Sequence, residues 1–150
     1  MRLAANKMSA LSVLRSIRST RGRLGARCEL PVPDSSPRKR LSAATLPLRA
    51  LALETPPDRR HPLHVAVPSR DARVQASFAA CTVYSTGLPP RAFAEVADGV
   101  VIPCPELLFL ELAPLMMPAV HALLGYELCG SYARDPADPR TGPSPLTCRP

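Results

Sequence analysis

The sequence predicts a small α+β domain in which a few short strands form a mixed sheet and two apolar helices pack on it. Two stretches carry this prediction. Residues 98–132 are the longest dense apolar run, and residues 63–96 hold short strand-like segments separated by turn residues. The 150 residues suffice for one domain, and a hydrophobic fraction of 46% supports a core. With 4% aromatic residues and no Trp, that core must consist mainly of Leu, Val and Ala.

The predicted sheet contains three or four short strands, identified by alternating or β-branched residues between turn signals. The candidate segments are Leu63–Val67, Cys81–Tyr84, Phe93–Val96 and Val100–Ile102. The last two form a predicted hairpin, because Gly99 between them can adopt the positive φ that a tight turn needs.

Two apolar helices are predicted after the last strand. The first runs from Pro105 to about Leu115, where Pro105 suits the first helical position and Glu106 adds negative charge near the positive helix end. It is apolar on nearly every face, so we expect neighbours on more than one side. The second runs from Pro118 to Leu124, and Gly125 either ends or bends it. The first helix is too short to span a bilayer, so we expect no membrane association.

A third helix is predicted near the N-terminus, from Ser9 to about Ser19, with Ser9 as its N-cap. Its apolar residues recur at helical spacing and are Met8, Leu11, Leu14 and Ile17. Arg15 and Arg18 lie off that stripe. We expect this helical front to be loosely attached to the core.

Nineteen prolines predict long irregular segments and divide the chain into four parts. Residues 1–28 form a basic helical segment, and residues 29–62 form a proline-rich, partly disordered linker. Residues 63–132 form the α+β core, and residues 133–150 form an irregular tail.

The charge is concentrated in the front half. Residues 1–75 carry 15 Lys+Arg and 5 Asp+Glu, whereas residues 76–150 carry 4 and 7, which gives +10 and −3. A basic front suits a phosphate-bearing partner such as DNA. The candidate nucleic-acid contacts are Arg15, Arg18, Arg21, Arg23, Arg38, Lys39 and Arg40. The alternative is that these arginines are simply solvated, since no aromatic residue accompanies them to stack on bases.

Cysteine and histidine usage predicts neither a metal centre nor a disulfide framework. The five cysteines form no CxxC pair and are odd in number, which is typical of reduced cysteines in a cytoplasmic protein. His61 and His64 with Cys81 lack a fourth zinc ligand, so we predict no metal and no cofactor. An alternative for Met1–Cys28 is a mitochondrial transit peptide, because this segment has seven basic residues and no acidic one.

No catalytic residue is predicted. Glu106 and Glu111 superficially resemble the carboxylates of a PD-(D/E)xK nuclease, but Ala113 stands where that motif needs its lysine. The chain also contains no GxSxG, P-loop or GxGxxG motif. His121 lies in an apolar helix and is interpreted as a core residue.

Several segments resemble an uncharacterised bacterial family. They are Ser9-Ala10-Leu11 with the arginine-rich helix that follows, Leu63–Arg73, Leu88–Val96, Val100–Leu112 and Leu124–Tyr132. Many members of that family carry a C-terminal very-short-patch-repair-like endonuclease domain, and others are compared to antitoxins of abortive-infection type IV toxin–antitoxin systems. The resemblance covers most of the chain from Ser9 on.

The chain departs from this family in two respects. Lys7-Met8 stands where the family usually has a histidine, and the nuclease-like half of the family would follow Tyr132, whereas this chain stops at Pro150. The resemblance therefore implies a non-catalytic N-terminal module, truncated or complete, that binds nucleic acid through its basic front. The alternatives are a protein-interaction module, which binds a partner or itself through the apolar helices 105–124, and a gene remnant without function.

Overall fold

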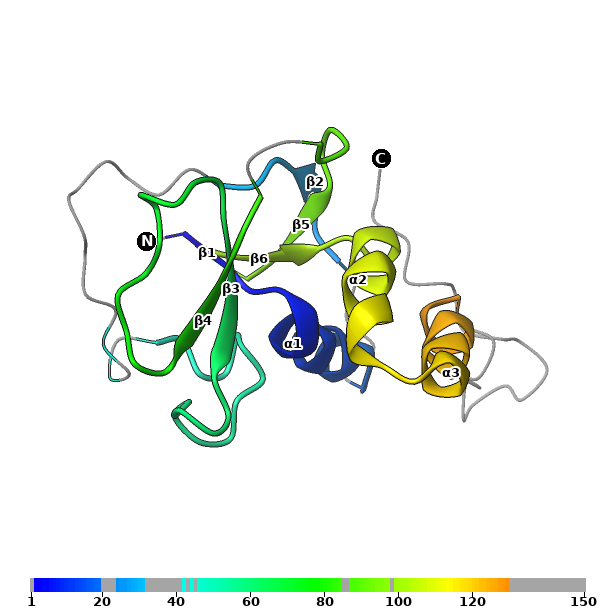
Figure 1. Cartoon of the computed structure of the whole chain (residues 1–150), viewed down its shortest axis with the longest axis horizontal. Coiled ribbons are helices and arrows are strands. Elements are labelled where there is room, and N and C mark those ends of the chain that lie inside the picture. Colours follow the sequence, from blue (N-terminus) through cyan, green and yellow to red (C-terminus); the bar gives the residue numbers. More distant parts are fainter. Residues whose placement is uncertain are drawn as a thin grey trace.

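The computed structural model describes residues 2–19, 24–31, 42, 44, 46–84, 87–97 and 99–129. In these residues it shows the α+β fold that the sequence predicts (Figure 1). The elements in chain order are β1 (Leu3–Ala4), α1 (Lys7–Ser19), β2 (Arg27–Cys28), β3 (Leu63–Val67), β4 (Ala79–Val83), β5 (Phe93–Ala97), β6 (Val100–Pro103), α2 (Pro105–Leu112), the 3-10 helix η2 (Ala113–Leu115) and α3 (Pro118–Leu128).

The described strands form a mixed four-stranded sheet and a separate two-stranded sheet. The larger sheet has the order β1-β6-β5-β2, with β1 parallel to β6 and the other neighbours antiparallel. β3 and β4 pair in parallel in the smaller sheet. A single antiparallel bridge between Ala5 and Val65 connects the two sheets.

The predicted hairpin is confirmed as β5 and β6. Gly99 in its turn has a φ of 73°, a conformation that L side chains rarely adopt. All four residues of β6 are buried, in agreement with the continuous apolar, β-branched run that predicted this strand. β4 begins at Ala79, two residues before the predicted start, and ends at Val83, one residue before the predicted end.

The expectation of a loosely attached N-terminal helix is wrong. Ala10, Leu11 and Leu14 of α1 are at most 1% exposed, and the helix packs against α2 and β3. Ser9 is not the N-cap either, because α1 already begins at Lys7. The Ser9 Oγ instead accepts a hydrogen bond from the N–H of His64 at 2.9 Å.

One hydrophobic cluster draws residues from most of the described chain. It includes Leu3 and Leu14 from the basic N-terminal segment, Leu51 from the proline-rich segment, and Leu63 and Leu128 from the predicted core. The residues before Leu63 thus contribute to the same core as the residues after it. Residues 32–41 and 133–150 of the predicted linker and tail lie outside the described part of the chain.

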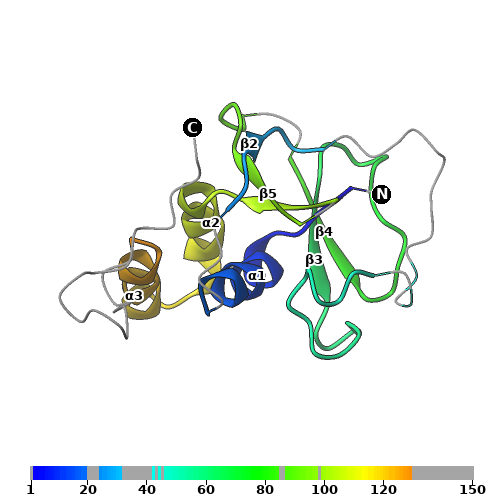
Figure 2. The same ribbon diagram turned by 180° about the vertical axis from the view of Figure 1, so that it is seen from behind.

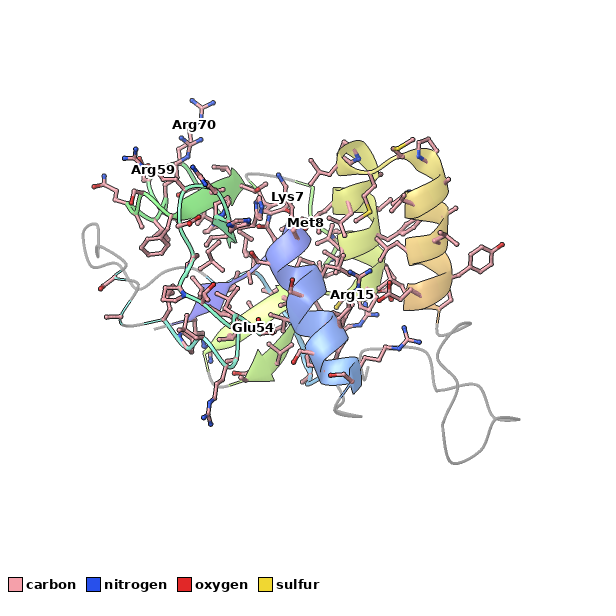
Figure 3. All side chains as sticks on the ribbon, turned by 90° about the horizontal axis from the view of Figure 1, so that it is seen from below. Lys7, Met8, Arg15, Glu54, Arg59 and Arg70 are labelled. Carbon is pink, nitrogen blue, oxygen red and sulfur yellow. The ribbon has the colours of Figure 1, made fainter. Side chains whose placement is uncertain are left out.

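The three α-helices lie side by side, with α2 between α1 and α3 (Figure 3). α2 therefore has neighbours on two sides, as its apolar sequence predicts. α3 continues to Leu128, four residues beyond the predicted end, because Gly125 does not end it. A Cβ on Gly125 would lie 3.2 Å from Cε2 of Phe109, so glycine permits the close approach of α3 to α2.

Candidate functional site

The two predicted nucleic-acid contacts in α1 are engaged by α3. Nε and Nη2 of Arg15 each donate to the Glu127 carboxylate at 2.8 Å, and Nη1 of Arg18 donates to the Glu127 carbonyl at 2.6 Å. Figure 3 places Arg15 on the side of α1 that faces the other two helices. The hydrogen bonds from Arg15 lower the pKa of Glu127 below its usual value. These arginines therefore join two helices, although the Arg15 side chain remains 55% exposed.

The other five candidates for nucleic-acid contact lie outside the residues that the structure describes. They are Arg21, Arg23, Arg38, Lys39 and Arg40.

The histidine pair and Cys81 do not converge on one point. His61 is exposed and lies 3.7 Å from Asp58, measured from Nδ1 to Oδ1. In the parallel β3–β4 pair Cys81 lies beside Val65, so its side chain is on the opposite face from that of His64. Across the described ranges, no group of three His, Cys, Asp or Glu residues could hold a metal ion.

The two glutamates of α2 have different partners. Glu106 lies in the first turn, where it was predicted to act as a helix-start charge, and accepts a hydrogen bond from Nη2 of Arg27 at 2.7 Å. Glu111 lies one and a half turns later and faces the start of α1. The two carboxylates therefore share no site.

Glu111 belongs to a polar cluster with Asn6, Lys7, His64 and Tyr84, which joins α1, α2 and the β3–β4 pair. The Tyr84 hydroxyl donates a short hydrogen bond to Oε1 of Glu111, and the Lys7 N–H donates to Oε2 at 3.1 Å. Nδ2 of Asn6 donates to the Tyr84 hydroxyl at 3.3 Å. The Asn6 N–H donates to the His64 carbonyl at 3.0 Å.

Partial burial shifts the pKa values of three side chains in the polar cluster. Burial raises the pKa of Glu111, and the hydrogen bonds from Tyr84 and the Lys7 N–H oppose that rise. Burial and the neighbouring Glu111 raise the pKa of Tyr84, which keeps the phenol protonated and able to donate. Burial, followed by the positive charge of Lys7, lowers the pKa of His64. The neutral phenol therefore remains the donor of the hydrogen bond to Glu111.

Two features of the polar cluster depart from ordinary geometry. Asn6 stands at the N-cap position of α1 and is fully buried, yet its Oδ1 has no hydrogen-bond partner within the described residues. An N-cap oxygen usually accepts from the first turn of its helix. Lys7, the next residue, has a φ of 48°, which is strained for a side chain with a Cβ. Figure 3 shows Lys7 and Met8 at this first turn.

Sequence reasoning missed the polar cluster because its members are far apart in the chain. Asn6 and Tyr84 are separated by 78 residues, and Lys7 and Glu111 by 104. A single tyrosine and a single glutamate form no sequence motif that would indicate a contact between them. The only local hint was that Glu111 interrupts an otherwise apolar helix.

An apolar surface covers the outer side of α3 and extends to the end of α2. Seven large apolar side chains are exposed in the described part of the chain, and all except Met8 lie between residues 110 and 126. The apolar surface consists of Leu110, Leu115, Met117, Val120, Leu123 and Tyr126, which are 49–74% exposed. α3 buries only Leu124 and Leu128. At 100° per residue, Leu123 and Tyr126 point away from that buried side.

The orientation of α3 is set by its contact with α2. The rings of Phe109 and His121 stack with centroids 3.8 Å apart, and Nε2 of His121 lies 2.8 Å from the Phe109 carbonyl oxygen. His121 is therefore half-buried between the helices, in agreement with its interpretation as a packing residue.

No helix within the described ranges has both the length and the apolar character needed to cross a membrane.

Comparison with protein-family models, with curated proteins and with solved structures finds no match to this chain. The resemblance to the endonuclease-like and antitoxin-like bacterial family therefore stays a prediction.

Proposed function

We propose that this chain is a non-catalytic protein-interaction module that associates with a second copy of itself through the apolar surface. The observation that carries the proposal is the clustering of exposed side chains: six of the seven large apolar side chains that are exposed in the described residues lie between Leu110 and Tyr126. Single exposed apolar residues are ordinary on a protein surface, whereas a cluster of this kind is typical of an interface.

The charge distribution favours a second copy as the occupant. The chain carries a net charge of +7, but no Asp, Glu, Lys or Arg occurs from Leu112 to Tyr126. Two copies that meet here bring no like charges together. A surface that pairs with itself about a two-fold axis needs no other partner. α3 lies at one end of the molecule, where a second molecule can approach without meeting the sheets (Figures 1 and 2).

The size of the apolar surface sets the expected affinity. Complete burial of one large apolar side chain contributes about 1.5–3 kcal/mol, and these side chains are about half exposed. Six of them on each of two copies would contribute roughly 9–18 kcal/mol before costs. Association itself costs about 4–15 kcal/mol. The midpoints of these two ranges differ by about 4 kcal/mol, which corresponds to a dissociation constant on the order of millimolar.

Sedimentation at increasing protein concentration tests this proposal. We expect the mean mass to rise with concentration, and Leu123→Glu to lower it at every concentration because the charge would be buried in the contact. Met8→Glu is the matched control, since it places the same charge on the exposed apolar residue outside the apolar surface. Circular dichroism shows whether both variants keep their helices. Unchanged masses for Leu123→Glu would overturn the proposal.

Nucleic-acid binding is the second candidate function. Four arginines on the loops that flank β3 are exposed, namely Arg59, Arg60, Arg70 and Arg73. Figure 3 shows Arg59 and Arg70 projecting away from the ribbon. These residues, rather than Arg15 and Arg18, are the described positions best placed for phosphate contacts. Their positive charge supports binding that depends on salt rather than on base sequence.

Fluorescence anisotropy of a labelled DNA duplex, measured from low to moderate salt, tests this second candidate. We expect affinity to fall steeply as salt rises, and Arg59→Gln with Arg70→Gln to reduce the slope by about two, one for each lost phosphate contact. Arg15→Gln is the control, because Glu127 already binds its guanidinium. A protein that fails to bind at low salt would exclude the nucleic-acid function.

The family prediction has a separate test. If the chain is the N-terminal module of an endonuclease-like or antitoxin-like protein, the DNA that follows the codon of Pro150 should encode a carboxylate-rich nuclease-like half in one of its frames. Unrelated DNA in all three frames would count against that family.

A further inference from the structure

The outer edge of β4 exposes unpaired backbone groups. β3 and β4 pair in register from Leu63–Ala79 to Val67–Val83. The Leu63 N–H donates to the Phe78 carbonyl at 2.8 Å, and the Tyr84 N–H donates to the Val67 carbonyl at 2.9 Å. In a parallel pair, these flanking bonds determine which residues point their backbone N–H and C=O groups toward the partner strand. Ala80 and Thr82 bond to β3, and the backbones of Ala79, Cys81 and Val83 face away from it.

The two edges of this small sheet differ in how their backbone groups are satisfied. On the β3 side, the carbonyl of His64 accepts from the Asn6 N–H, and the N–H of His64 donates to Ser9 Oγ. On the β4 side, the Ala79 N–H donates to the Ala76 carbonyl at 3.1 Å. Within the described residues, no partner is present for the Ala79 carbonyl or for the N–H and C=O groups of Cys81 and Val83.

The β4 edge also lacks the residues that usually protect an edge strand. Natural edge strands carry charged side chains or proline that prevent pairing with another chain. From Val74 to Leu88 the sequence contains neither. Every residue of β4 is partly exposed.

We propose that the outer edge of β4 pairs antiparallel with β4 of a second copy, about a two-fold axis at Cys81. In this register the two Cys81 residues lie opposite each other and exchange both backbone hydrogen bonds. Val83 of each copy then donates its N–H to the Ala79 carbonyl of the other, which makes four bonds. A fifth and sixth bond would need the Ala79 N–H, which is already bonded to Ala76.

This contact is independent of the apolar surface. β4 and α3 lie at opposite ends of the molecule in both ribbon views (Figures 1 and 2). Two different two-fold contacts on one chain would link copies into an assembly larger than a dimer. The β4 contact therefore extends the proposed self-association from a pair to a larger assembly.

The test uses the full chain with Leu123→Glu, so that the apolar surface does not contribute. We expect this variant to form a dimer at high concentration. Adding Val83→Pro removes an outward N–H without removing a β3–β4 bond, and should weaken the dimer at least tenfold. Adding Val83→Ala removes most of the same side chain but keeps the N–H, and should leave the dimer in place.

Amide hydrogen exchange provides a readout that does not depend on a proline variant. In the Leu123→Glu background, the amides of Cys81 and Val83 should become protected as concentration rises, whereas the Ala80 amide, bonded to β3, should be protected throughout. Equal exchange of Cys81 and Val83 at low and high concentration, whether fast or slow, would overturn the β4 contact. A dimer of Leu123→Glu that survives Val83→Pro would do the same. Neither result bears on the apolar surface.

Discussion

Removal of the Tyr84 hydroxyl tests whether the polar cluster stabilises the fold. Tyr84→Phe keeps the ring, which packs edge-on against Phe93 with centroids 6.4 Å apart. It removes the hydrogen bond to Glu111 and the one from Asn6. The substitution therefore separates hydrogen bonding from packing.

The structure sets the size of the expected effect. A hydrogen bond to a charged group contributes about 1.5–3 kcal/mol, and a neutral one about 0.5–1.5 kcal/mol. Tyr84 is only partly buried, so solvent screening reduces both values. We expect Tyr84→Phe to lower the free energy of unfolding by about 2 kcal/mol at pH 7. Urea unfolding followed by circular dichroism measures this difference.

The same pair makes a prediction about alkaline pH. The pKa of Tyr84 is raised above 10 in the folded protein, so above pH 10 the unfolded chain loses the phenol proton while the folded chain keeps it. The stability of the wild-type protein therefore falls as pH rises above 10. Tyr84→Phe has no phenol at this position, so its stability does not include this decrease. The difference between the two proteins should narrow above pH 10.

Ser77→Ala is the control, because it removes a hydroxyl from an exposed residue outside the polar cluster. At concentrations low enough to keep the protein monomeric, it should change stability by less than about 0.5 kcal/mol. Equal stability of Tyr84→Phe and the wild type at pH 7 would refute the assigned role of the hydroxyl. A difference that stays constant above pH 10 would refute its assigned ionisation.

Three further predictions concern stability and are checked by urea unfolding. Leu108→Ala should lower the free energy of unfolding by about 2–5 kcal/mol because the side chain is fully buried. Leu110→Ala in the same helix should lower it by less than about 0.5 kcal/mol because this side chain is 67% exposed. Similar costs for the two variants would contradict the packing of α2. Gly25→Ala should cost about 1–3 kcal/mol because its Cβ would lie 2.5 Å from the Glu95 carbonyl oxygen; a neutral result would mean that β5 yields easily. The raised pKa of Glu111 means that its proton stabilises the fold below pH 4.5 and that this contribution is lost as pH rises through the folded pKa. The stability of the wild type relative to Glu111→Gln should therefore decrease from pH 4 to pH 7, and an increase would contradict the burial of the carboxyl.

Elements with strong local signals were predictable from the sequence. The β5–β6 hairpin follows from a β-branched run beside Gly99, and the start of α2 follows from Pro105 and Glu106. In each case the deciding residues are neighbours in the chain. β1 and β2 were missed because two-residue strands have no periodicity and exist only through pairing with β6 and β5.

The candidate sites were less predictable than the fold. The sequence placed Arg15 and Arg18 on the surface for a nucleic acid, but Glu127 of α3 binds both. It also offered the apolar helices 105–124 as a partner-binding alternative, and the structure shows which of their apolar side chains are exposed, on α2, on α3 and on the segment between them. Which face of a helix is covered depends on its neighbours, and these are set by the tertiary arrangement.

The sequence by itself determined the α+β class, the hairpin and the positions of the three main helices, because turn chemistry and apolar periodicity act over a few residues. Only the tertiary structure decided that α1 is part of the core, that Glu111 meets Lys7 and Tyr84, and that the edge of β4 and the outer side of α3 remain open within the described residues. Those contacts join residues up to 104 positions apart. Their formation depends on how whole elements pack, which no local pattern encodes.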